Sequence, residues 1–428
     1  MDHRCAPAHT REILRWRKSF ASRQPNVYPN EDQRLQVGPK ESTVDVFLDS
    51  GSLHLGPPHR YRALRTFLEK AKVSKSSVKE DPTSDQISIV DDRCDPAPSV
   101  AIAGNEYASF SRAWNHPAYF NNPPPGLHVN VSGFNAESLY RHLKRPRKDT
   151  ADRRIIYAMD LNPTTALAII MNVASLHVTE PRGFVLEFHI PYFALRTDKE
   201  SRRDERGLRK CRYIQAPGGS RRHQECIYEA QISLMVFGMG EFFWTAYCFV
   251  DTYYSRQEST GSYLRKKSDA PSGGYLKQES PIWDPRYYFL TVLSIRLSQV
   301  SLEWTALVQT LEENLDPHSD VDDLSTGVEW TKQRTQTIGA VRQLRNCLGK
   351  LLATWNAFDS EQSTYFGLDE EGALFDQFRG LFSYLREKAA ELKCLYMTLE
   401  QRVETLEKTN LHILSYWQVM MMSKNFSI

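Results

Sequence analysis

The sequence predicts an α+β (or α/β) sheet domain followed by a long antiparallel helical bundle or stalk. Apolar residues alternate at 184–190, and the segments 229–237 and 242–251 are rich in strand-forming residues. The segment 163–176 is apolar on almost every side, which is typical of a helix buried against a sheet. From Leu374 to Met420, apolar residues recur about every 3.5 residues, the period of a coiled coil.

The sheet domain is predicted to span residues 154–280. A strand at 155–159 leads to Asn162, a favourable helix cap, and to Pro163, which suits the first helical position. The glycines at 238–241 predict a hairpin turn between the next two strands. Two insertions, a basic one at 196–222 and a Ser- and Gly-rich one at 255–280, predict mobile surface loops.

Residues 1–153 are predicted to form a poorly defined N-terminal region with flexible segments. The part at 73–99 is rich in Ser, Lys and Asp, with a small apolar patch at 87–90, and most of it is predicted to be a flexible connection. A helix is expected at 136–144, ending before Pro146.

Residues 281–428 are predicted to form the helical bundle and a long coiled-coil-like stalk. One helix begins at Pro285 and ends near Leu315, a second covers 330–358, and the heptad helix follows. A stripe of that length is buried only by other helices, either within the chain or between subunits. Asn410 is a polar seam position, which sets register at some cost in stability. The predicted oligomer seam consists of Leu385, Leu392, Leu399, Leu406, Asn410 and Ile413.

Composition excludes several classes of protein. The chain is 41% hydrophobic and 25% charged, as in ordinary globular proteins, and its net charge of +2 predicts no specific nucleic-acid partner. Seven scattered cysteines without a Cys-x-x-Cys pair support neither a zinc knuckle nor a disulfide framework and indicate a reducing compartment. The apolar run 232–250 is interrupted by Gly238, Gly240 and Glu241, so no membrane span is predicted. With a polar N-terminus that is no secretory signal, this predicts a cytoplasmic chain.

No catalytic or phosphate-binding motif is present, so the chain is not expected to be an enzyme. Glu187 and His189 are two residues apart and lie on one face of a strand, so they could bind a metal or act as an acid–base pair. The favoured interpretation is a structural, hydrogen-bonded pair. The acidic link 312–323 could hold magnesium through carboxylate oxygens, but it lacks EF-hand spacing, which favours a solvated loop. The candidate metal ligands are Asp316, Asp320, Asp322 and Asp323.

Several short motifs follow one another in a fixed order along the middle of the chain. They are Asp-Leu-Asn-Pro-Thr at 160–164, Leu-Glu-Phe-His-Ile-Pro at 186–191, Tyr-Glu-Ala-Gln-Ile-Ser at 228–233, Phe-Val-Asp-Thr-Tyr at 249–253 and Trp-Asp-Pro-Arg-Tyr-Tyr-Phe at 283–289. This order resembles the cytosolic region of the fungal CorA-like magnesium transporter family, whose members are mostly uncharacterised. The resemblance covers about a third of the chain directly. It implies an α/β domain that leads into a long stalk helix, two membrane helices near the C-terminus, and a homo-pentamer with a Gly-Met-Asn motif at the pore mouth.

The sequence departs from that pattern at the pore. No apolar helix pair follows the stalk, and Gly238-Met239-Gly240 falls in the hairpin rather than beside a pore helix. Transport by this chain alone is therefore not predicted. If a transmembrane helix pair is missing from the C-terminus, the protein would instead be expected in a membrane. The resemblance implies a non-enzymatic cytosolic domain of CorA-like design that self-associates through its stalk. The alternative is an interaction module that binds a different protein through the C-terminal helix seam.

Overall fold

The computed structural model describes residues 58–71, 87–93, 129–145, 151, 153–173, 184–198, 202–214, 224–240, 243–255, 259–314, 327–361 and 366–425. The strands are β1 (Ser88–Arg93), β2 (Val129–Phe134), β3 (Arg153–Met159), β4 (Phe184–Asp198), β5 (Cys211–Ile214), β6 (Gln224–Gly240) and β7 (Phe243–Val250). The helices are α2 (Pro58–Leu68), α4 (Ala136–Leu143), α5 (Pro163–Val173), α6 (Thr260–Lys266), α7 (Pro285–Asn314), α8 (Gly327–Glu361) and α9 (Ala373–Asn425). The α+β class is confirmed.

One mixed sheet organises the described residues. Its strand order is β2-β1-β3-β7-β6-β4, with β5 paired to β6. The neighbours β3 and β7 run parallel, and α5 follows β3 directly. The predicted hairpin joins β6 to β7, and its register shifts between Gly238 and Gly240. A Cβ at Gly238 would lie 2.5 Å from the Phe243 carbonyl oxygen, so the close approach of the two strands requires glycine.

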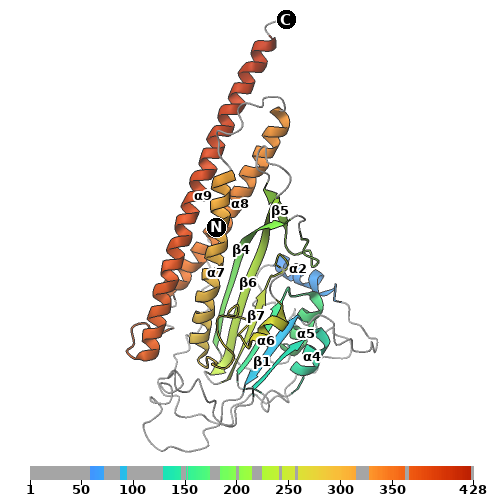
Figure 1. The fold of residues 1–428 in the computed structure, drawn as a ribbon, viewed down its shortest axis with the longest axis vertical. Coiled ribbons are helices and arrows are strands. Elements are labelled where there is room, and N and C mark those ends of the chain that lie inside the picture. The colour runs from blue at the N-terminus through green and yellow to red at the C-terminus, as the bar shows by residue number, and fades with distance from the viewer. Residues whose placement is uncertain are drawn as a thin grey trace, which may run out of the picture.

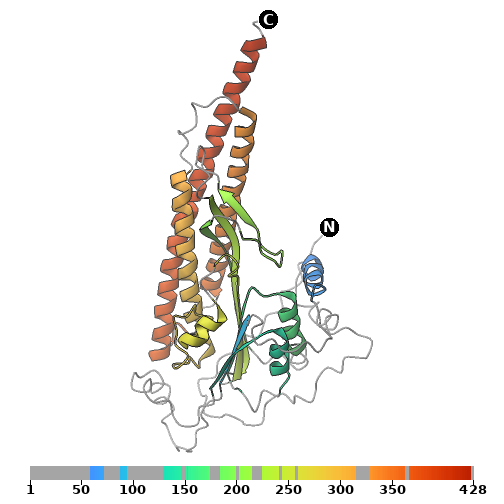
Figure 2. The same cartoon turned by 45° about the vertical axis from the view of Figure 1, so that its right-hand side comes forward.

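Helices cover both faces of the sheet. Figures 1 and 2 show α4 and α5 on one face and the long helices α7, α8 and α9 on the other. The larger apolar core lies between the sheet and the long helices. A smaller core under α4 and α5 contains Val90, Leu139, Ile156, Ile169 and Tyr247.

The N-terminal region contributes two strands to this sheet. The expectation of a flexible connection at 73–99 is wrong for residues 88–93, which form the buried strand β1 between β2 and β3. Its charged residues are paired: Asp91 lies 3.1 Å from Arg153, and Asp92 lies 2.7 Å from Arg154. Composition misled the prediction because buried ion pairs, rather than apolar side chains, allow this strand to enter the sheet.

The two insertions also differ from mobile surface loops where the structure describes them. Residues 259–280 form α6 and a tight turn in which Asp269 is buried and accepts hydrogen bonds from the Ser272 amide and the Tyr288 hydroxyl. Arg296 on α7 donates to the carbonyl oxygens of Ala270 and Pro271, which fixes the turn against the helix. Parts of the basic insertion extend β4 and form β5.

The long helices pack side by side. The salt bridges Arg386–Asp359 and Arg342–Glu407 align α9 with α8 in opposite directions. Ser298 of α7 contacts Tyr384, and Arg402 donates to the carbonyl oxygen of Glu312, so α7 runs in the same direction as α9. Figure 1 shows the C-terminal end of α9 extending beyond both neighbours. Among the described residues, no helix combines the length and apolarity that a membrane crossing requires.

Candidate functional site

The predicted oligomer seam lies mostly inside the chain. Leu385, Leu392, Leu399 and Leu406 are 0% to 4% exposed and belong to the core shared with α7 and α8. An interface between subunits through these leucines remains a prediction, but in the isolated chain they are not on the surface. The Asn410 amide is half-buried, and its Oδ1 has no hydrogen-bond partner in the described structure. Ile413 lies in α9, outside the residues whose side chains are described.

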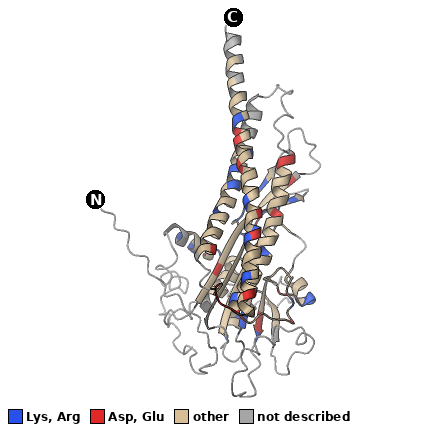
Figure 3. Ribbon diagram, turned by 90° about the vertical axis from the view of Figure 1, so that its left-hand side faces the viewer, with Lys and Arg blue, Asp and Glu red and all other residues tan. Residues whose placement is uncertain are grey.

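The overhanging end of α9 carries exposed apolar side chains. Leu411 and Val419 are both 67% exposed. Charged residues of both signs are distributed along the long helices (Figure 3). We call α9 beyond Asn410 the overhang, and among its described side chains Leu411 and Val419 present apolar surface.

A charged centre occupies the carboxyl edge of the parallel strands. Asp160 follows β3 and Asp251 follows β7, and parallel strands bring both residues to the same edge of the sheet. The 202–210 segment places Arg206 between them, with its side chain 7% exposed. Its Nη1 lies 2.8 Å from Asp251, its Nε donates to Asp204 at 2.7 Å, and its Nη2 lies 3.7 Å from Asp160.

A chain of hydrogen bonds connects this charged centre to the exposed side chain of His189 on β4. Arg209 donates to Asp251 at 2.7 Å and to the side-chain oxygen of Gln231 at 3.1 Å. The Gln231 amide in turn donates to Ser233 Oγ at 2.8 Å, and Ser233 Oγ lies 3.0 Å from His189 Nδ1. The network therefore runs from the buried Asp251 to an exposed histidine.

The carboxylates of the charged centre differ in their electrostatics. Burial raises the pKa of Asp160, although hydrogen bonds from the Thr252 amide and hydroxyl oppose that shift. Burial acts in the same direction on Asp204, but the hydrogen bond and charge of Arg206 outweigh it and lower the pKa of Asp204. Asp160 also has φ 45°, in the left-handed region, which lets its carboxylate reach the backbone after β7.

Glu187, His189 and Ser233 lie in the order of an acid–base–hydroxyl set. His189 Nε2 lies 3.9 Å from Glu187, and Ser233 belongs to β6, a strand paired on both sides. Catalysis of acyl transfer needs free hydrogen-bond donors beside the nucleophile and a pocket for substrate. Two cavities among the described residues measure about 10 Å³ each, room for one water molecule, and neither is lined by Glu187, His189 or Ser233. The arrangement therefore favours the structural interpretation of the Glu187–His189 pair.

The described residues contain no group of three or more His, Cys, Asp or Glu side chains placed to hold a metal ion. The predicted magnesium ligands Asp316, Asp320, Asp322 and Asp323 lie outside those residues. Their prediction is unchanged.

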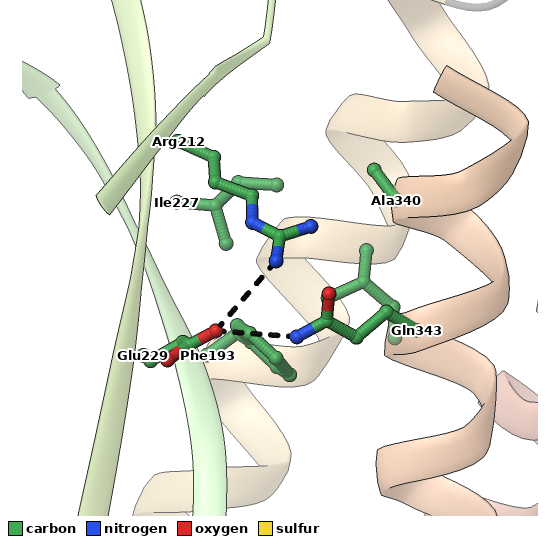
Figure 4. Close-up of a pocket in the computed structure, with 7 residues that line it drawn as sticks. Phe193, Arg212, Ile227, Glu229, Ala340 and Gln343 are labelled. Atoms are coloured by element: carbon green, nitrogen blue, oxygen red, sulfur yellow. Dashed lines mark hydrogen bonds and ion pairs between the residues drawn. The ribbon is translucent and has the colours of Figure 1, made fainter. Parts of the chain in front are cut away.

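A polar contact links the sheet to α8 beside one of the small cavities. Figure 4 shows Gln343 of α8 and Arg212 of β5 pointing toward Glu229 of β6, at 3.2 and 4.0 Å. Phe193 and Ile227 line the same cavity. Sequence reasoning missed this contact, although an acid inside an otherwise apolar strand was a usable signal.

The comparisons with known proteins supply no relative. No protein-family model matches the chain. No curated protein is significantly similar to it. Its function therefore has to be argued from its own residues and from the ordered motifs.

Proposed function

We propose that the chain is a non-enzymatic assembly domain of CorA-like design that self-associates through the overhang of α9. The observations that carry the proposal are the 53-residue helix α9, whose last turns extend beyond α7 and α8 (Figure 1), and the exposure of Leu411 and Val419 toward its C-terminal end. Exposed apolar residues on an isolated helix end are stabilised by packing against another helix.

The layered architecture supports the CorA-like part of the proposal. A sheet with helices on both faces that leads into a long C-terminal helix fits the cytosolic design that the resemblance implies. Motif residues hold this architecture together. The Asp160 carboxylate accepts hydrogen bonds from the Thr252 and Tyr253 amides after β7, and the Asp284 carboxylate accepts hydrogen bonds from the Arg286 and Tyr287 amides at the start of α7. Such roles suit a structural motif set better than a catalytic one.

Asn410 supports self-association close to the overhang. Its Oδ1 has no partner in the described structure, and it lies between the buried leucines and exposed Leu411. A buried amide without a partner costs free energy, whereas an Asn at a coiled-coil seam can pair across subunits and set their register. Because the Oδ1 atom is buried in the isolated chain, pairing across subunits would require the helices around Asn410 to repack on association.

The link to divalent cations rests on the resemblance and on the acidic link. In our proposal, magnesium would act through Asp316, Asp320, Asp322 and Asp323 as a response of the assembly rather than as a cofactor of chemistry. Carboxylate oxygens are the ligands that this cation prefers.

The assembly proposal is tested by light scattering over a range of concentrations. The expected result is a molar mass that rises to a defined multiple of the 49.4 kDa chain. A strict monomer at high micromolar concentration would overturn the proposal.

A second candidate function is capture of a different protein by the same helix. The free overhang favours it as much as it favours self-association. Leu399 and Leu406 are poor positions for testing it, because Asp at either would disrupt packing within the chain. Leu411→Asp with Val419→Asp is the better variant. A monomeric wild type whose capture of a partner is lost in this variant would favour the second function.

A further inference from the structure

Strand β4 forms one edge of the sheet. It pairs with β6 along its whole length, from Phe184 opposite Gly238 to Asp198 opposite Gln224. Within the described residues, no strand pairs with its other side. An open strand edge presents unpaired N–H and C=O groups to which another strand can add.

The direction of the backbone groups along β4 follows from Pro191. Proline has no N–H to give to β6, and the Pro191 carbonyl oxygen instead lies 3.8 Å from Cys347 Sγ on α8. Alternate residues of a strand direct their backbone groups to the same side. Val185, Glu187 and His189 therefore direct theirs away from β6, toward the open edge.

The open part of this edge is short and polar. Helix α8 lies beside the edge at Pro191. At 185–189, Val185 is 58% exposed, and the side chains of Glu187 and His189 are 57% and 56% exposed. A polar edge can simply protect a sheet from unwanted pairing. The arrangement of the charges along the edge therefore determines whether it can pair with a second strand.

We propose that segment 187–189 pairs antiparallel with the same segment of a second copy of this chain. In the register centred on Phe188, each Glu187 stands opposite His189 of the second copy, so acidic and basic groups face each other across both ends of a two-fold axis. A register centred on Glu187 would place two carboxylates opposite one another, which is unfavourable. Beyond residues 187–189 this register would bring Val185 toward Pro191, where α8 already lies, so the pairing ends there.

This contact is separate from the overhang of α9. It uses backbone hydrogen bonds at the sheet edge, and it requires no residue beyond β4. A few paired residues bury little surface, so the contact is expected at high protein concentration rather than at nanomolar levels.

Hydrogen exchange of the intact chain tests the pairing at the level of single amides. The amides of Glu187 and His189 are expected to gain protection as concentration rises, while those of Leu186 and Phe188 are protected by β6 throughout. The measurement is made in the Leu411→Asp, Val419→Asp background, so that failure of the α9 proposal does not affect it. Protection of Glu187 and His189 that is independent of concentration would overturn the proposal and indicate a cover from within the chain.

A charge exchange tests the register. His189→Glu places two acids opposite one another and is expected to abolish the concentration-dependent protection. Adding Glu187→Lys in the same chain restores opposite charges and is expected to restore the protection. Glu371→Lys changes an exposed charge away from β4 and serves as the control. Melting curves establish that each variant is folded. If the double variant stays unprotected while folded, or if His189→Glu has no effect, the proposed pairing is wrong.

Discussion

The sheet layer and the helical layer of this protein bury their residues by different chemistry. In the sheet layer, Arg93, Arg153 and Arg206 are almost fully enclosed, and each guanidinium contacts a carboxylate. In helices α8 and α9 of the helical layer, the buried residues whose side chains are described are apolar, with Phe378 and Leu392 both 0% exposed. The sheet layer therefore depends on intact charge pairs, and the helical layer depends on filled volume.

The same contrast divides α9 along its length. Its seam leucines are part of the apolar core, whereas Leu411 and Val419 lie on the surface of the overhang. Substitutions in the two layers should therefore fail in different ways, and substitutions in the overhang should leave stability unchanged.

The largest effect is expected when a buried charge pair is broken. Asp251→Asn removes the carboxylate shared by Arg206 and Arg209 and leaves two guanidinium groups poorly compensated. Breaking a buried pair costs roughly 3–5 kcal/mol of unfolding free energy. Chemical denaturation measures it. Asp359→Asn, which removes the partner of the exposed Arg386, is the control and should cost about 0–1 kcal/mol. Equal losses in the two variants would remove the distinction between buried and exposed pairs.

The helical layer should respond to lost volume instead. Leu392→Ala removes apolar atoms from a fully buried site, which typically costs about 2–5 kcal/mol. Met397→Ala, on the exposed side of α9 at 47% exposure, should change stability by no more than about 0.5 kcal/mol. Comparable losses at both positions would mean that Leu392 is not packed as described.

Acid should weaken the sheet layer selectively. His142 and Arg154 lower the pKa of Asp92 against the opposing effect of burial, and the pKa of Asp204 is lowered in the same direction. A carboxylate whose pKa is lowered in the folded state stabilises that state above its unfolded pKa of about 3.9, and this stability is lost as the pH falls through the folded pKa.

The measurement is unfolding free energy against pH below about 5. Asp92→Asn should flatten the decline of stability in acid, because one of the responsible carboxylates is gone, whereas Leu392→Ala should lower the whole curve without changing its slope. An unchanged slope in Asp92→Asn would show that this ion pair does not carry the acid sensitivity.

Magnesium is expected to have the smallest effect. If Asp320, Asp322 and Asp323 bind the ion, millimolar magnesium should raise the melting temperature of the wild type by mass action, and changing all three to Asn should abolish the rise. The favoured interpretation, a solvated loop, predicts identical melting with and without magnesium in both proteins. Calcium at the same concentration controls for a general effect of divalent charge.

Local patterns in the sequence predicted much of the fold. Asn162 caps α5 by accepting the Thr165 amide, and the predicted first long helix agrees with α7 to within one residue at its C-terminal end. These features depend on neighbouring residues, so the sequence displays them directly.

Features that depend on distant partners were not visible in the sequence. Asp91 and Asp92 made β1 resemble a solvated segment, because Arg153 and Arg154, which pair with them across the sheet, lie 62 residues away. The same limit applies to α9: a heptad repeat shows that a stripe is buried, but it does not show whether the covering helix belongs to the same chain. The charged centre around Arg206 was missed for the same reason.

The most direct measurement of the proposed function compares two exposed apolar sites by light scattering. Leu411→Asp with Val419→Asp alters the overhang, and Leu302→Asp alters a residue of α7 that is 69% exposed outside it. Self-association through the overhang predicts that the wild type and Leu302→Asp assemble while the double variant remains a folded monomer. Assembly of the double variant equal to that of the wild type would contradict it.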